Sequence, residues 1–321
     1  MPVGDEPATV SGKKSRNCYY DICILLRRCA RYCTGEYCRL QEHYDAAFFA
    51  HKSARTRLRL PSDNSDEPIT RRVGQCPEFY ATHNTMSAVI RIGTSGFSYK
   101  EWLGGFYPEK LPGTKMLAHY ATRLPTVEIN YTFRAMPKRE MLDKWAAQTP
   151  EHFRFALKAP QRITHFQKLK QVDNLVGHFA EVASAMASRL GPALFQLPPN
   201  FRRDVPLLRD FLAMLHGRLR PAFEFRDQSW FDDSVLEALR EGGAALCIAE
   251  SETIASPVEV TAPFVYLRLR NEDYSPDETR QWAERISRMA VESSEIYIFF
   301  KHETSAPDRA FRLRELLPGA L

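Results

Sequence analysis

Ionisable and amide side chains recur at the ends of short apolar segments between residues 86 and 321. Two are carboxylates and the others are amides or cations: Glu128, Glu224, Asn130, Gln196, Lys158, Arg226, Arg268, Arg270 and Lys301. Two carboxylates in one site can act as general acid and general base, and Lys and Arg side chains bind phosphates and carboxylates. These residue types indicate acid/base chemistry on a small anionic substrate, such as a phosphorylated or sugar-like compound.

Glu128 and Glu224 are the candidate catalytic residues, since a carboxylate beside cations stays ionised whereas a drier one holds a proton. The other polar residues are candidates for substrate binding: Asn130, Lys158, Gln196, Arg226, Arg268 and Lys301. Tyr99 and Trp230 follow apolar segments and are candidates to stack on the face of a sugar or a base. Substitution of Glu128 or Glu224 by Gln is expected to abolish turnover and to preserve the fold.

Metal ligation is not predicted from the sequence. His165, His302 and Glu303 are of ligand type, but their spacing matches no metal-binding motif. Residues 93–99 contain two glycines but lack the Lys of a P-loop and the complete dinucleotide fingerprint. The sequence therefore assigns no metal site and leaves any cofactor unidentified.

Eight apolar segments rich in β-branched and aromatic residues must position these side chains. They are residues 89–93, 126–130, 153–158, 193–197, 222–226, 244–248, 264–269 and 295–300. Their first residues are on average about 29 residues apart, which is the length of a βαβ unit. Eight such units within residues 86–321 predict an α/β fold of the (β/α)₈ TIM-barrel type. An open, doubly wound sheet is the alternative.

Helix signals separate most of these segments. Ser275 followed by Pro276 is typical of a helix start, Asp232 precedes a second helix, and Gly191 is expected to end a long helical stretch. Residues 251–263 are too few and too rich in β-branched side chains to predict a helix.

A closed barrel would bring the polar residues together. Alternate side chains of each strand point into a barrel, and these polar residues share one parity near the carboxyl ends of the strands, where the active sites of TIM barrels lie. Charged groups are costly in a core unless they are paired. Two interpretations remain open: a binding site with excess positive charge, or an ion network that only fills the top of the barrel.

Residues 1–85 differ in composition from the rest of the chain. They hold six of the seven cysteines, at spacings that match no zinc template: Cys18, Cys23, Cys29, Cys33, Cys38 and Cys76. Residues 61–85 have the Pro, Asp, Asn and Ser content of a linker. We therefore expect a low-order leader and linker over residues 1–85 and a globular domain over residues 86–321, beginning near Met86.

The net charge of +5 divides into +3 for residues 1–85 and +2 for residues 86–321. The longer part is nearly neutral and has no global electrostatic reason to coat a polyanion. No apolar run is long enough to cross a bilayer, and the first thirty residues do not have the pattern of a secretory signal. Together with the cysteine usage, this predicts a cytoplasmic protein without a membrane partner.

Several motifs occur in a characteristic order over residues 90–317. They are residues 93–99 (GTSGFSY), 126–130 (TVEIN), 153–160 (FRFALKAP), 163–165 (ITH), 191–199 (GPALFQLPP), 224–226 (EFR) with Ser229 and Trp230, and 300–303 (FKHE). In these motifs the chain resembles the YecE-like family, known as domain of unknown function 72. The resemblance implies a TIM barrel that begins near Met86. It implies no particular activity, because none is settled for the family.

Two function classes remain open. The first is an enzyme, such as a hydrolase or isomerase, that acts on a small anionic substrate at the barrel mouth. The second is a nucleic-acid-associated barrel, either a phosphodiesterase or a non-catalytic binder, whose Lys and Arg side chains contact phosphates. The nearly neutral charge of residues 86–321 favours the first class.

Overall fold

The computed structural model describes residues 88–251, 254 and 256–321. The expected leader and linker over residues 1–85, the interpretation of their cysteines and the boundary near Met86 lie outside the described residues.

Eight parallel strands form a closed barrel in which each strand pairs with its neighbours in sequence and β8 pairs with β1. The strands are β1 (Val89–Ser95), β2 (Thr126–Ile129), β3 (Arg154–Lys158), β4 (Leu190–Gln196), β5 (Pro221–Glu224), β6 (Ala245–Ala249), β7 (Phe264–Leu269) and β8 (Glu295–Phe300). The predicted TIM barrel is therefore confirmed, and the open doubly wound sheet is wrong because β8 closes onto β1 along six residue pairs.

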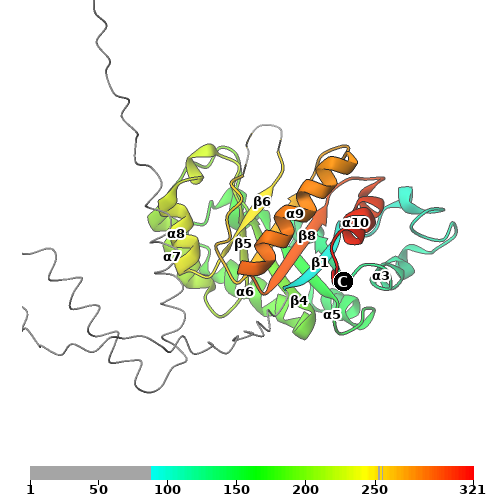
Figure 1. Ribbon diagram of the computed structural model, residues 1–321. Coiled ribbons are helices and arrows are strands. Elements are labelled where there is room, and N and C mark those ends of the chain that lie inside the picture. The colour runs from blue at the N-terminus through cyan, green and yellow to red at the C-terminus, as the bar shows by residue number, and fades with distance from the viewer. Residues whose placement is uncertain (1–87, 252–253, 255) are drawn as a thin grey trace, which may run out of the picture. The chain divides into compact units, whose positions relative to one another are not determined.

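Helices follow the strands and lie outside the barrel (Figure 1). The α-helices are α3 (Gly113–Ala121), α4 (Tyr131–Arg134), α5 (Arg139–Ala147), α6 (Asp173–Ala183), α7 (Val205–Leu215), α8 (Asp233–Glu241), α9 (Pro276–Glu292) and α10 (Ala306–Glu315). Shorter helical turns are η1 (Lys100–Trp102), η2 (Arg162–Phe166), η3 (Ser184–Arg189) and η4 (Gln228–Trp230). No helix stands among the described residues between β6 and β7, as the composition of that segment predicts.

The local helix signals are confirmed at two positions and wrong at one. Ser275 forms a capping box with Glu278 at the start of α9, and Asp232 caps α8 by accepting a hydrogen bond from the backbone of Ser234. Gly191 does not end a helix, because it lies inside β4. A Cβ at Gly191 would lie 3.0 Å from the carbonyl oxygen of Phe155, so the glycine permits close packing of β4 on β3.

Alternation of side chains along the strands divides the core in two. Residues that are mostly small or aromatic fill the inside of the barrel, among them Ala156, Leu194, Ala222, Ala245, Cys247, Tyr266, Tyr297 and Phe299. The other face of each strand packs against the surrounding helices in a larger apolar cluster. Gly93 marks a tight point between β1 and β2, since a Cβ there would lie 2.0 Å from the carbonyl oxygen of Thr126.

The amino-terminal end of the barrel is closed by ion pairs. Glu295, at the start of β8, binds Arg91 at 2.7 Å and Arg220 at 2.5 Å. The guanidinium of Arg220 also lies over the ring of Phe264, 4.7 Å from its centroid. In TIM barrels this end serves stability and the opposite end carries function, so a functional site is expected at the carboxyl ends of the strands.

None of the helices in the described part of the chain is both long enough and apolar enough to span a membrane.

Candidate functional site

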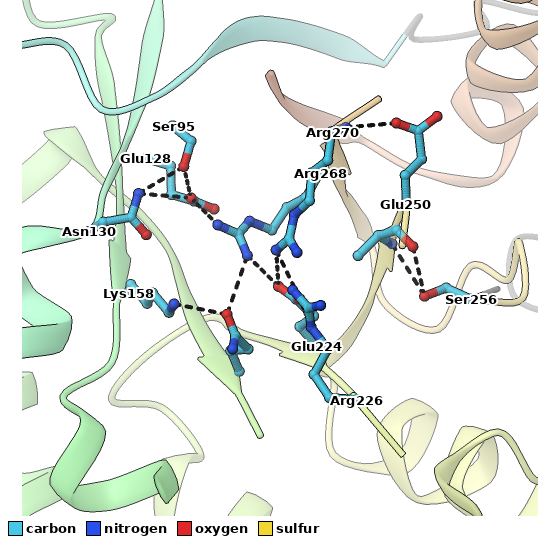
Figure 2. Close-up of polar contacts among 12 residues, drawn as sticks. Ser95, Glu128, Asn130, Lys158, Glu224, Arg226, Glu250, Ser256, Arg268 and Arg270 are labelled. Atoms are coloured by element: carbon cyan, nitrogen blue, oxygen red, sulfur yellow. Dashed lines mark hydrogen bonds and ion pairs between the residues drawn. The ribbon is translucent and has the colours of Figure 1, made fainter. Parts of the chain in front are cut away.

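Arg268 lies at the centre of the carboxyl end of the barrel and bridges two buried carboxylates (Figure 2). One of its terminal nitrogens donates to Glu128 Oε1 at 2.8 Å and the other donates to Glu224 Oε2 at 2.5 Å. The side chains of both glutamates are completely buried, and that of Arg268 is 2% exposed. Residues from β2, β5 and β7, far apart in sequence, thus meet in one ion network.

Glu128 is surrounded by hydrogen-bond donors. Ser95 donates to Oε1 at 2.5 Å, Tyr266 donates to Oε2 at 2.7 Å, and Asn130 donates to Ser95 Oγ at 2.8 Å and to Glu128 Oε1 at 3.3 Å. Burial alone would raise the pKa of this carboxyl. The charge of Arg268 and the hydrogen bonds from Ser95 and Tyr266 outweigh burial and hold the pKa of Glu128 below its ordinary value.

Glu224 is shared by three arginines. Besides Arg268, Arg226 donates to its Oε1 at 2.5 Å and Arg270 contacts both oxygens, at 2.9 and 3.1 Å. Burial again opposes ionisation, but the charges of Arg268 and Arg270 outweigh it, so the pKa of Glu224 also lies below its ordinary value.

The sequence suggested that one of the two carboxylates donates a proton and the other accepts one. The surroundings of Glu128 and Glu224 do not differ in that way. Both have lowered pKa values and both are ionised at neutral pH. Arginines and hydroxyl or amide donors occupy their oxygens, so neither glutamate offers a proton. What the arrangement provides instead is a rigid frame that fixes three guanidinium groups at the barrel mouth.

Lys158, the last residue of β3, is linked to this frame through the amide of Gln196, whose Oε1 also accepts a long hydrogen bond of 3.5 Å from Arg268. Its Nζ donates to Gln196 Oε1 at 2.8 Å and sits 4.0 Å from the centroid of the Phe133 ring. Burial, followed by the charge of Arg268, lowers the pKa of Lys158 to about 8, although Glu128 and Glu224 act in the opposite direction. Within the described part of the chain, Lys158 forms no ion pair with a carboxylate.

The mouth cluster, defined as Glu128, Lys158, Gln196, Glu224, Arg226, Arg268, Arg270 and Lys301, carries more positive than negative charge. Lys301 lies directly after β8 and is exposed at the residue level, but its ammonium group is partly shielded from water. This partial burial, followed by the charge of Arg270, lowers the pKa of Lys301. A third carboxylate, Glu250, accepts hydrogen bonds from the Arg270 backbone at 2.7 Å and from Trp282 Nε1 at 2.9 Å, so it is already occupied. Five cations thus face three carboxylates, which favours an anionic ligand.

The predicted site residues Glu128, Asn130, Lys158, Gln196, Glu224, Arg226 and Arg268 are brought together through these contacts. Tyr99 lies at the edge of the cluster, where it donates to the carbonyl oxygen of Ser95 at 2.8 Å. Trp230 does not belong with them. Its side chain is fully buried, stacks on Phe225 with centroids 4.7 Å apart, and donates to the carbonyl oxygen of Phe201. It has no free ring face for a ligand.

Two residues that contact Glu128, Ser95 and Tyr266, escape the sequence-based assignment. The predicted first strand ends at residue 93, but β1 continues to Ser95 and turns its hydroxyl toward Glu128. Tyr266 shares the parity of Arg268 along the chain, so strict alternation from Arg268 is the signal that identifies it. Arg270, which the same parity predicts, contacts Glu224.

Exposed aromatic rings flank the mouth on the turns that follow β2 and β3. Tyr131 is 56% exposed and Phe166 is 69% exposed. Phe166 ends the π-helical turn η2, and Lys168, Leu169 and Gln171, just beyond it, have positive φ although none is glycine. Such turns and strained backbones concentrate at functional sites. This irregular segment begins at Arg162, shortly after Lys158 of the mouth cluster.

A narrow cavity of about 20 Å³ between α9 and α10 is a weaker candidate. Among its lining residues, Arg309 donates to the backbone carbonyls of Asn271 and Glu272, and the polar atoms of Tyr274 and Trp282 bind Glu250. These groups serve internal contacts and leave little for a ligand. Among residues 88–251, 254 and 256–321, no group of three or more His, Cys, Asp and Glu side chains is arranged to hold a metal ion.

Comparison with known proteins gives a consistent assignment. The family model described as "Protein of unknown function DUF72" matches residues 91–320. The UPF0759 protein YecE of Escherichia coli K12 is 32% identical over 172 residues, which are 52% of this chain and 61% of YecE. The chain thus aligns with less than two thirds of that relative. The UPF0759 protein YunF of Bacillus subtilis is 24% identical over 271 residues, covering 71% of this chain and 95% of YunF.

Two solved structures share the fold. A DUF72 family protein from Thermotoga maritima superimposes with a TM-score of 0.64 at 24% identity, covering 71% of this chain and 98% of that chain. A DUF72 family protein from Enterococcus faecalis gives a TM-score of 0.60 at 23% identity, with 71% and 97% covered. The family match over most of the barrel means that this chain belongs to the DUF72 family of proteins of unknown function.

Proposed function

We propose that the barrel mouth binds a small anionic substrate, phosphorylated or sugar-like, and that the protein acts on it by acid/base chemistry. The observation that carries this proposal is the surplus of cations over carboxylates in the mouth cluster. Lys158 and Lys301 have no carboxylate partner among the described residues. Cations without a carboxylate partner, at the end of a TIM barrel where active sites lie, are suited to hold a phosphate or carboxylate.

The exposure of each side chain indicates its role at the mouth. The side chains of Arg226 and Arg270 are 24% and 16% exposed, so each can contact both Glu224 and a ligand. Lys301 is more open still. Glu128 and Glu224 are ionised and orient the arginines, whereas Lys158, with a pKa of about 8, is the group that can exchange a proton near neutral pH.

A sugar-like body fits the aromatic side of the mouth. Sugars and bases stack on aromatic rings, and Tyr131 and Phe166 offer exposed rings on the turns after β2 and β3. These two residues take the role that the sequence gave to Trp230.

The proposal is tested by thermal unfolding in the presence of phosphorylated sugars, their unphosphorylated parents and sodium chloride at matched ionic strength. A ligand that binds the folded state raises the melting temperature, and the stabilisation grows with the logarithm of one plus the ratio of ligand concentration to Kd. We expect a rise with at least one phosphorylated sugar or inorganic phosphate and no rise with the parent sugars. No response to any anion, or the same response to chloride, would remove the proposal.

The exposed rings of Tyr131 and Phe166, on turns that follow β2 and β3, also support the alternative, a nucleic-acid-associated barrel that contacts bases and phosphates. Most of the cations are recessed, however, and residues 86–321 carry a charge of only +2. Titration of a short oligonucleotide at several salt concentrations separates the two. A steep fall of affinity with salt indicates several phosphate contacts and favours the alternative.

The expected cytoplasmic location remains part of this proposal, because small phosphorylated metabolites are intracellular compounds; cell fractionation tests it.

A further inference from the structure

In the part of the chain that the structure describes, Lys158 is the buried cation of the mouth cluster that has no carboxylate partner. Only 8% of the residue is exposed, yet its hydrogen-bond acceptor is the neutral amide oxygen of Gln196. A buried ammonium group is costly without a carboxylate partner. In this barrel the two nearest buried carboxylates are bound by arginines instead.

This division of partners has a chemical consequence. Arginine keeps its proton at any pH that proteins tolerate, whereas a desolvated lysine next to other cations can lose its proton. A carboxylate paired with Lys158 would hold the amine in its protonated form. The pairing of Glu128 and Glu224 with arginines leaves the amine free to become a neutral nucleophile.

The surroundings also fix where the amine lies. Gln196 Oε1 accepts one hydrogen from Nζ at 2.8 Å, and the Phe133 ring covers another side at 4.0 Å from its centroid. His165 packs edge-on against the same ring, with centroids 4.9 Å apart, and burial followed by the charge of Lys158 lowers the pKa of His165. The amine is thus held at the end of β3 beside neutral groups and fixed guanidinium groups.

Other nucleophiles near the barrel interior fit less well. Cys247 is fully buried in the inner core, and burial raises the pKa of its thiol, so the reactive thiolate is disfavoured. Lys301 also lacks a carboxylate partner among the described residues, but its side chain is exposed to water. Lys158 is therefore the best placed amine.

We propose that Lys158 forms an imine with the carbonyl group of an anionic aldehyde or keto compound whose charged group is bound by Arg226, Arg270 and Lys301. This inference rests on the proposed function for the anionic part of the ligand, and it names the substrate class as a carbonyl compound.

The covalent step balances without a further reagent. The neutral amine nitrogen bonds to the carbonyl carbon, the π electrons move to the carbonyl oxygen, and a proton passes from nitrogen to oxygen. The resulting carbinolamine takes up one proton from solvent and loses its hydroxyl as water, which leaves a protonated imine on Lys158. The imine withdraws electrons from the neighbouring carbon and so weakens the bonds on that carbon.

Reductive trapping tests the inference. Full-length protein is treated with glyoxylate, a small anionic aldehyde, and cyanoborohydride, which converts the imine into a carboxymethyl amine that peptide mass spectrometry locates. Exposed Lys170 is the internal comparison. A change of pKa from 10.5 to about 8 raises the neutral fraction at pH 7 by more than about a hundredfold, so we expect Lys158 to react at least about tenfold faster than Lys170.

Two further arms separate this inference from the anion-binding proposal. Inorganic phosphate should slow the labelling of Lys158 and leave that of Lys170 unchanged. If phosphate stabilises the protein but Lys158 reacts no faster than Lys170, anion binding stands and the imine is refuted. If Lys158 reacts fast but phosphate neither protects nor stabilises, the nucleophile stands and the anion site is refuted. A rate for Lys158 that rises only above pH 10 also overturns the inference.

Discussion

Arg268 and Glu128 lie 140 residues apart in the sequence, and they form a fully buried ion pair with 2.8 Å between nitrogen and oxygen. The same guanidinium also binds Glu224. This double contact ties β7 to β2 and β5 across the barrel mouth and fixes the charge distribution there.

Replacement of Arg268 by Met should destabilise the protein strongly. It leaves Glu128 and Glu224 buried with less compensation, and loss of one partner of a buried pair costs about 3 to 5 kcal/mol. The free energy of unfolding in urea measures the effect. Arg240→Met is the control, because its pair with Glu259 is half exposed and should be worth less than about 1 kcal/mol. Equal stability of the two variants would contradict the account.

Acid should remove the stabilisation that Glu128 provides. Its folded pKa lies below the ordinary value of 4.5, so the unfolded chain binds more protons as the pH falls through this region. The advantage of the wild type over Glu128→Gln should be constant above about pH 5.5 and shrink below about pH 4.5. Urea unfolding between pH 7 and pH 3 measures it, and a difference that stays constant or grows in acid refutes the ionised, hydrogen-bonded state of Glu128.

The fold could be predicted from the sequence because its signals are local and repeated. Residues 264–269 and 295–300 are strands as predicted, and Ser275 caps α9. The exception at Gly191 has a physical reason, since the glycine is needed for the approach of β4 to Phe155 rather than for a helix end. A local pattern does not distinguish these two uses of glycine.

Lys158→Met should make the protein more stable at pH 7. The fold lowers the pKa of Lys158 from 10.5 to about 8, so it disfavours the charged form, and the variant removes this cost of about 1 to 3 kcal/mol. In the wild type the cost disappears as the pH rises from about 8 to 10.5. Thermal or urea unfolding measures the gain, and exposed Lys170→Met should change stability by less than about 0.5 kcal/mol. A less stable Lys158→Met protein would mean that the lysine serves packing.

Gly93→Ala should impair the barrel at its tightest point. A Cβ would meet the carbonyl oxygen of Thr126 at 2.0 Å, and backbone atoms cannot move aside as a flexible side chain does. We expect a loss of at least about 1 to 3 kcal/mol. Gly113→Ala is the matched control, since nothing lies within 4 Å of its added Cβ. The idea fails if both variants unfold at the same urea concentration.

The site was less predictable than the fold. Strand parity brought Glu128, Lys158 and Arg268 to one mouth, but the roles of these residues depend on which carboxylate pairs with which cation. That pairing depends on the three-dimensional positions of the side chains. The arginines that bind the two glutamates keep both carboxylates ionised. The position of Trp230 could not be predicted for a similar reason. The sequence does not distinguish an aromatic residue after a strand that faces the mouth from one that packs in the core, as Trp230 does on Phe225.

The central claim, an anion site at the barrel mouth, is tested most directly by calorimetric titration of inorganic phosphate into three proteins: the wild type, the double variant Arg226→Met/Lys301→Met, and the control Arg240→Met/Lys170→Met with the same loss of charge on the surface. We predict that phosphate binds the wild type and the control alike and binds the mouth variant at least about tenfold more weakly, a loss of about 1.4 kcal/mol. Equal binding to all three proteins, or no binding to the wild type, would contradict the account.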